Sequence, residues 1–381
     1  MPPPAANRVP ATAALQHLLH HVGVTVRESL LFLQAGGIGA GVFAFHYERE
    51  NSASLFLAGR HLWADDLAYL TAAAKRLGAS TTVRETTSVR TAEQQLREAL
   101  AGGQPVIAWV DMAHLPHRAM PSHFSGGGYH VVTVDSIDGD TALIHDLAPA
   151  PIAIPLRDLS SARGRIAKFR NRLFWLSGGL KKRPDAAAVT RDALRTCVTA
   201  LAKAKMSNFR LDAFAELAER MAGHGGKESW EVMFPAGARL WTALTSLHQY
   251  IEHYGTGGGL CRTIFAEGLR EAGRADDAER YAALGRRWSA LAAAALPGDI
   301  PACHEATELF ARRSSLIGTS APVAELRAVW ERLGRLAQEC QRKFPLPATR
   351  VKELSAALSA QLRVIHAEEV AALASLAALN P

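Results

Sequence analysis

Apolar residues recur at helical spacing over residues 12–21 and 24–33, which predicts two opening helices. Further along, apolar runs bounded by turn residues predict strands. The predicted strands cover 42–47, 81–85, 105–111, 129–136, 141–146 and 152–155, and further helices cover 65–77 and 94–100. An Asp-Gly step separates the strands over 129–136 and 141–146, so these two should pair as a hairpin within an antiparallel sheet.

Beyond residue 184 the pattern changes, and alanine, leucine, arginine and glutamate recur at helical spacing. Helices are predicted over 187–204, 210–222, 237–254, 260–271, 275–295, 323–343 and 348–379. The stretch 177–184 separates the two patterns and is interpreted as a linker. We therefore predict an α+β domain over residues 1–180 and an all-helical bundle domain over residues 181–381.

The composition is that of an ordinary globular protein, with 48% of the 381 residues hydrophobic and 21% charged. Residues 1–10 have no apolar run like that of a signal peptide, and no later stretch is long and apolar enough to cross a bilayer. We therefore expect a soluble, cytoplasmic protein with no membrane partner. A homodimer through the long final helices is as compatible with the pattern as a monomer.

The net charge of +7 includes a compact basic run between residues 163 and 183. It is interpreted either as solvated surface and linker or as a docking surface for an acidic partner. An acidic carrier protein or a phosphate-bearing ligand fits such a surface better than nucleic acid, because no aromatic residues are interleaved as in a nucleic-acid-binding motif.

The four cysteines are far apart and form no CxxC pair, so neither a zinc site nor a disulfide framework is predicted. They are Cys197, Cys261, Cys303 and Cys340. The predicted α+β domain therefore has no thiol.

The glycine-rich stretch 36–41 is not interpreted as a nucleotide-binding loop. Such a loop follows a strand and opens a helix, whereas this one follows a helix and opens a strand. We expect it instead to let the backbone pass close to a neighbouring chain or a ligand.

The hairpin carries the strongest chemical signal of the sequence. His130 begins one strand and Asp146 ends its partner, so antiparallel pairing should bring the two side chains together. A carboxylate beside an imidazole fixes its tautomer and stabilises its protonated form, as in the base half of a catalytic triad. A purely structural histidine–aspartate pair is the alternative.

Four stretches of the chain carry a family resemblance: PVIAWVD (105–111), LPHR (115–118), YHVVTVDSIDGDTALIHDL (129–147) and YGTGGGLCRTIFAEGL (254–269). Together they resemble the butirosin biosynthesis protein H-like family. It implies a papain-like N-terminal domain and a helical domain of unassigned function. It also implies an acyltransferase of antibiotic biosynthesis, which moves an acyl or aminoacyl group from an acyl carrier protein thioester to an amine of a small natural product.

By this resemblance, His130 and Asp146 correspond to the histidine and acidic residue of the family. Glu28 and the turn over 36–41 match the stretch after its first helix. The family has a His-Cys pair just before that helix, and here Val9 and Pro10 stand in those positions. The cysteine that would act as nucleophile is therefore missing.

Three mechanisms remain open. Thr12 or Ser29 supplies an oxygen nucleophile. Alternatively, the amine attacks a carrier or coenzyme A thioester directly, with His130 as base and backbone N–H groups at the helix start stabilising the oxyanion. Finally, the domain has lost catalysis and kept binding. No cofactor is predicted, and Asp111, Glu28 and Thr12 are further candidates for substrate contacts.

Histidines crowd the loop before residue 130. His114, His117 and His123 could surround a metal ion together with Asp111 or Asp146. The alternative, which we favour, is a polar loop exposed to solvent, because the spacing fixes no two ligands together.

One polar, glycine-rich island interrupts the helical half. It contains Glu252, Tyr254, Gly258 and Arg262. It is either a turn between helices or a wall of the active cleft, where Arg262 would bind a carboxylate or phosphate of the substrate.

The leading hypothesis is thus an acyltransferase that uses His130 and Asp146 as its base pair. Its partners would be an acyl carrier protein or acyl-coenzyme A donor and a small-molecule amine acceptor. A non-catalytic protein that binds a small molecule, metal or protein is the second hypothesis. A peptidase or amidase is the third, and the missing cysteine weighs most against it.

Overall fold

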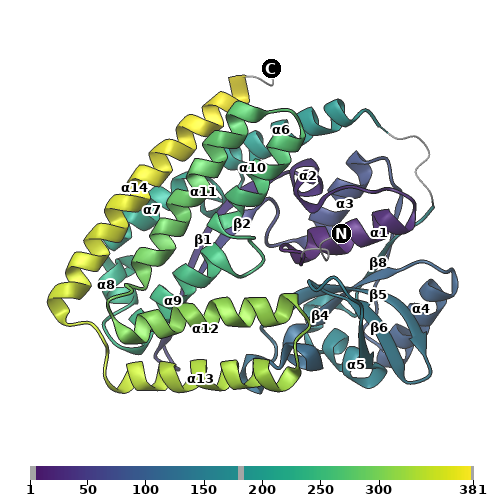
Figure 1. Ribbon diagram of the computed structural model, residues 1–381, viewed down its shortest axis with the longest axis horizontal. Helices are drawn as coiled ribbons and strands as arrows, with labels where there is room; N and C mark the ends of the chain where they lie inside the picture. Colours follow the sequence, from purple (N-terminus) through teal and green to yellow (C-terminus); the bar gives the residue numbers. More distant parts are fainter. Residues whose placement is uncertain (1–5, 179–183, 379–381) are drawn as a thin grey trace. The chain divides into compact units, whose positions relative to one another are not determined.

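The computed structural model describes residues 6–178 and 184–378. The chain divides into two compact units, drawn together in Figure 1. The first takes in residues 1–31, 66–185 and 312–331, and the second takes in 32–65, 186–311 and 332–381. Residues 179–183 of the expected linker lie outside the described residues. The domain boundary at residue 180 stays a prediction.

The first unit combines a sheet with short helices. Its helices are α1 (Pro10–His21), the start of α2 (Glu28–Gln34), α3 (Asp66–Arg76), α4 (Val89–Ala101) and α5 (Leu156–Arg165). Its strands are β3 (Thr81–Arg84), β4 (Val106–Asp111), β5 (Tyr129–Asp138), β6 (Thr141–His145), β7 (Ile152–Pro155) and β8 (Leu173–Leu176). Segment 312–331 adds the end of α12 (Pro301–Gly318) and the start of α13 (Val323–Arg342).

The six strands form one antiparallel sheet in the order β3-β8-β4-β5-β6-β7. Strand β4 lies inside this sheet, and all six of its residues are buried, which explains its continuous apolar run. Leu96 of α4 and Leu159 of α5 belong to the apolar cluster on one face of β4 and β5. Helix α1 packs against β5. The predicted α+β class and the meander of β4 to β7 are confirmed.

The second unit is mostly helical but includes one hairpin. Its strands are β1 (Ile38–Tyr47) and β2 (Ser52–Arg60). Its helices are α6 (Ala186–Lys203), α7 (Asp212–Met221), α8 (Trp230–Met233), α9 (Ala238–Glu252), α10 (Arg262–Glu271), α11 (Ala275–Ala295) and α14 (Ala348–Ala378). The remaining parts of α2, α12 and α13 also belong to this unit. Helix α14 runs along α7 and α11 (Figure 1). Among the described residues, no helix is both long and apolar enough to cross a bilayer.

The glycine-rich stretch lies at the start of β1. A Cβ atom on Gly39 would stand 2.4 Å from the carbonyl oxygen of Arg60 in the paired strand β2. Only glycine fits that approach. The expected close passage of backbone is therefore confirmed, and the neighbour is a strand.

Candidate functional site

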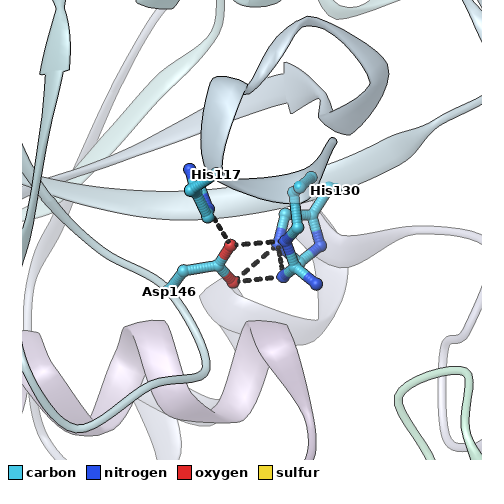
Figure 2. A network of polar contacts seen from close by, with 4 residues as sticks. His117, His130 and Asp146 are labelled. Atoms are coloured by element: carbon cyan, nitrogen blue, oxygen red, sulfur yellow. Dashed lines mark hydrogen bonds and ion pairs between the residues drawn. The ribbon is translucent and has the colours of Figure 1, made fainter. Parts of the chain in front are cut away.

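Three side chains, those of His117, Arg118 and His130, meet at the carboxylate of Asp146. Figure 2 shows His117 and His130 approaching this carboxylate from two sides. Nε2 of His130 lies 2.8 Å from Oδ1, and Nε2 of His117 lies 2.9 Å from Oδ2. Arg118 donates from Nε to Oδ2 at 2.8 Å and from Nη2 to Oδ1. The structure thus brings His130 and Asp146 together, as the hairpin pattern predicted, and adds two groups that the sequence analysis did not assign to this pair.

The elements of the first unit hold this network in place. His130 follows a loop of short 3-10 turns, and Asp146 comes directly after β6. Within the loop, the carbonyl oxygen of Arg118 accepts a hydrogen bond from Nε1 of Trp330 at 3.1 Å. Arg118 and Asp146 are both almost fully buried. The guanidinium therefore lies on the carboxylate in a bidentate, low-dielectric contact, the strongest kind of ion pair geometry.

Asp111 organises the same loop. Its carboxylate accepts hydrogen bonds from the amides of Ala113 at 3.1 Å and Gly126 at 2.6 Å, and the side chain is fully buried. A Cβ atom on Gly128 would collide with it at 2.4 Å. These contacts fix the loop before His130, so the position of Asp111 is structural, and its expected contact with substrate stays a prediction.

Nε2 of His130 lies between a guanidinium donor and a carboxylate acceptor, so its contacts allow two tautomers. Nη2 of Arg118 lies 2.9 Å from Nε2 of His130, but a guanidinium only donates. If Nε2 accepted that hydrogen, its lone pair would also face the Asp146 carboxylate. If Nε2 instead carries the proton, it donates to Asp146, and Arg118 keeps its carboxylate acceptors. In that tautomer Nδ1 of His130 is the basic atom, and within the described residues no group pairs with it.

The burial of this network changes two pKa values. Burial alone would raise the pKa of Asp146, but the charge of Arg118, followed by His130 and His117, holds it well below its usual range. Burial lowers the pKa of His117, and its bond to Asp146 only partly opposes this. Asp146 is therefore ionised and His117 neutral at pH 7, with Arg118 compensating the carboxylate charge.

At the start of α1, where the family has its cysteine, the polar groups are bound to partners within the chain. Helix α1 begins at Pro10, and Oε1 of Glu28 accepts hydrogen bonds from the amides of Arg8 at 2.9 Å and Val9 at 2.8 Å. Thr12 is fully buried, and its hydroxyl pairs with that of Tyr69 at 2.7 Å. Glu28 therefore occupies two amides at the helix start, the region whose backbone N–H groups were expected to stabilise an oxyanion. Thr12 is not presented as a nucleophile.

All four cysteines are buried, and none lies in the first unit. Burial raises the pKa of Cys197 and Cys303 to about 12 and that of Cys340 to about 11. Thiols of this kind are almost never thiolates at pH 7, so they are poor nucleophiles.

A cavity of about 530 Å³ lies in the first unit, partly open to solvent. It runs along one face of α1, from Asn7 and Pro10 to His17, and its opposite wall includes Thr133 and Asp146. A small ligand in this cavity would contact both the start of α1 and the carboxylate that holds His130.

The histidines of the loop have separate partners. His114 contacts the hydroxyls of Ser161 at 2.9 Å and Ser125 at 2.8 Å, His117 contacts Asp146, and the ring of His123 packs on Phe124. The structure does not bring the three together as a metal site. In the described part of the chain, the ligand atoms of His17, Asp135 and His145 do lie within 4.8 Å of one another.

The island in the helical half belongs to the second unit. Arg262 is fully buried, and its Nε donates to Oε1 of Glu369 at 2.6 Å. A buried guanidinium with this partner is a core group. Tyr254 is 37% exposed and contacts the ring of Tyr250. A role of Arg262 in substrate binding stays a prediction that the geometry of its own unit does not support.

Gly258, in the turn after α9, lies beside Glu252, the last residue of that helix. Gly258 has φ +84°, and a Cβ atom there would stand 3.3 Å from the carboxylate of Glu252. The other carboxylate oxygen of Glu252 is buried without a hydrogen-bond partner in the described residues. Their contact with a substrate also stays a prediction.

Two family models match consecutive parts of the chain. Residues 10–147 match butirosin biosynthesis protein H, N-terminal, and residues 156–298 match a domain of unknown function (DUF4872). The chain belongs to the butirosin biosynthesis protein H-like family. The resemblance drawn from the motifs is therefore confirmed, and with it the papain-like character of the α+β part. No curated protein matches the chain.

The sequence analysis missed Arg118 as a site residue of this family member. The only signal was its place at the end of the LPHR motif. An arginine in an irregular loop has no periodicity that shows where its side chain points, so its contact with Asp146 becomes visible only in the folded chain.

Proposed function

We propose that this protein of the butirosin-related family is an acyltransferase that joins the acyl group of a thioester to an amine by direct aminolysis. One observation carries the proposal: Nε2 of His130 lies 2.8 Å from Oδ1 of Asp146, and no described residue pairs with its Nδ1. An imidazole held in this way is a general base.

The reaction needs no enzyme thiol. The amine nitrogen attacks the thioester carbonyl, the C–N bond forms and the C–S bond breaks. Nδ1 of His130 takes the proton of the amine and returns it to the leaving thiolate. This scheme agrees with Pro10 at the family's cysteine position and with cysteines that are all buried. It requires no cofactor.

Arg118 is the proposed source of charge stabilisation. Its Nε and Nη2 are bound to Asp146, while Nη1 makes no hydrogen bond within the described residues. A guanidinium beside the base can donate to the oxygen that becomes negative during attack. We assign this role to Arg118 because Glu28 already holds the amides of Arg8 and Val9.

An acyl carrier protein or a coenzyme A thioester is the proposed donor, and a small-molecule amine is the acceptor. The exposed cations Arg165, Lys168 and Arg170 support an acidic or phosphate-bearing donor. Arg163 does not belong to this surface, because it is buried and donates to the carbonyl oxygens of Ala92 and Asn171.

Intact-mass detection of products tests this function. The purified chain is offered carrier-bound and coenzyme-bound acyl donors with amine acceptors, beside a His130→Gln variant. His123→Gln is the matched control, because His123 is an exposed histidine on the same loop. We expect His130→Gln to lose about 10²- to 10⁴-fold in rate and the control to keep its rate. Equal turnover by wild type and His130→Gln contradicts the proposed base.

A second candidate function is ligand binding without turnover. It is favoured by Glu28, which seals the start of α1 where the family has its nucleophile. In that case the 530 Å³ cavity retains a pathway intermediate or product. Thermal stabilisation by a natural-product amine, with no acyl transfer from any donor in the panel, would favour this candidate over the acyltransferase.

A further inference from the structure

Two imidazoles that line the cavity converge on one carboxylate. Nε2 of His17 lies 2.8 Å from Oδ1 of Asp135, and Nε2 of His145 lies 2.7 Å from Oδ2. The two rings face each other with centroids 4.0 Å apart. All three side chains are half-buried, and their ligand atoms lie within 4.8 Å of one another. The cluster thus combines two nitrogen ligands and one oxygen ligand at a single point.

Three different elements build this cluster within the first unit. His17 comes from the middle of α1, Asp135 from β5 and His145 from the end of β6. The register of β5 against β6 shifts between Val134 and Ser136, which places Asp135 at a β-bulge. Bulges re-aim side chains and are enriched beside functional sites.

A second observation indicates that the cluster faces a ligand. Thr133 precedes Asp135 by two residues on β5, and it lines the same 530 Å³ cavity as His17 and His145. Thr133 has no exposed surface, and its Oγ1 has no hydrogen-bond partner among the residues that the structure describes. A buried hydroxyl without a partner costs about 1–3 kcal/mol, which a bound water or ligand in the cavity would relieve.

The cluster can also be reached from a second hollow. This hollow has a volume of about 270 Å³ and is lined by His17 and Asp135, together with His20 and His21. His20 lines both hollows. The three ligands therefore leave coordination positions that face open space, as in metal sites that keep one position for water or substrate.

We propose that His17, Asp135 and His145 bind one divalent transition-metal ion, with Zn²⁺ as the best fit. Two imidazoles and a carboxylate are ligands that Zn²⁺ takes in open sites, whereas Mg²⁺ and Ca²⁺ prefer oxygen alone. A divalent ion held by one carboxylate and two neutral imidazoles leaves a net positive charge of one at the site. The bound ion would therefore attract an anionic group of a ligand into the cavity.

Metal titration of the full chain tests the site independently of any acyl transfer. The protein is freed of affinity tags, stripped with a chelator and titrated with Co²⁺, whose ligand-field absorption reports nitrogen and oxygen coordination. Zn²⁺ is then added as competitor. We expect one equivalent to bind and to raise the melting temperature, because an ion that binds only the folded chain stabilises it.

The variants Asp135→Asn and His145→Ala should each weaken binding about 10-fold or more. His224→Ala is the matched control, because His224 also contacts a carboxylate, Glu219 at 2.8 Å, but on the exposed surface. His123→Ala tests the histidine loop in the same way. Binding that is equally tight in wild type, Asp135→Asn and His145→Ala would overturn the proposal, as would loss of binding in His123→Ala alone. If His145→Ala does not fold, Asp135→Asn decides the result.

Discussion

Nε2 of His130 lies 2.8 Å from Oδ1 of Asp146, and the same carboxylate is bound by the guanidinium of Arg118. The pair that resembles the base half of a triad is thus part of a larger buried network. In such a network the arginine and the histidines share one negative charge, so each side chain affects the others.

Arg118→Met should lower the free energy of unfolding by about 3–5 kcal/mol, because it leaves the buried Asp146 without its main counter-charge. Urea unfolding followed by circular dichroism measures the change. Arg157→Met is the control, since the Arg157 side chain is 86% exposed and its ion pair with Asp158 is long, at 3.7 Å. A cost for Arg118→Met no larger than that of the control would show that the ion pair contributes little.

The low pKa of His117 predicts a pH dependence of stability. Burial lowers this pKa below the ordinary value of 6.5, so the folded state binds fewer protons than the unfolded state. The contribution of His117 is therefore fully present above about pH 6.5 and is lost as the pH falls toward its folded pKa. Unfolding free energies at pH 7 and pH 5 should differ more in wild type than in His117→Gln, which keeps a donor for Asp146.

His123→Gln is the control for that experiment, because His123 is an exposed histidine on the same loop. It should keep the pH dependence of the wild type. The slope that His117→Gln removes cannot exceed about 1.4 kcal/mol per pH unit, the value for one proton. An unchanged slope in His117→Gln would mean that the pKa of His117 is the same in the folded and unfolded chain.

The sequence predicted those parts of the site that depend on local pattern. The Asp-Gly turn and the alternation around it fixed the hairpin, and so His130 came next to Asp146. Arg118 and His17 were missed, because their partners are reached across the fold and not through a repeating pattern. For Arg262 the sequence left two readings open, and its partner Glu369 lies 107 positions away.

Some helices and strands were also missed in the sequence. The strand β2 and the helix α12 were not predicted, and α4 begins at Val89, five residues before the predicted start. Helix α5 was not predicted either. In this helix only Leu156, Leu159 and Ala162 form a buried apolar stripe, while the rest of the helix is polar. A helix with so few apolar positions is held by the sheet it covers, and its own pattern gives little signal.

The buried cysteines predict that the proposed chemistry is insensitive to thiol reagents. Because burial raises the pKa of Cys197 to about 12, the folded chain should react slowly with an aromatic disulfide reagent, and all four thiols should react quickly after unfolding in urea. Acyl transfer should survive alkylation of the folded protein. Rapid modification of one thiol with loss of turnover would instead indicate a cysteine mechanism.

The core of the second unit should depend on the ion pair between Arg262 and Glu369. Both side chains are fully buried, and Nε1 of Trp288 also donates to Oε1 of Glu369, at 2.9 Å. Arg262→Met removes the only charge that compensates Glu369 among the hydrogen-bond partners described for it. We expect a loss of about 3–5 kcal/mol in the free energy of unfolding, measured by urea with tryptophan fluorescence.

The double variant Arg262→Met with Glu369→Leu should recover much of that loss, because it removes both buried charges and leaves apolar groups of similar size. The exposed pair Arg270 and Glu279, at 2.6 Å, is the control, and Arg270→Met should cost less than about 1 kcal/mol. If Arg262→Met is as mild as Arg270→Met, the guanidinium is not needed for the fold. Its conformation would then be free to change, and a role in substrate binding would regain support.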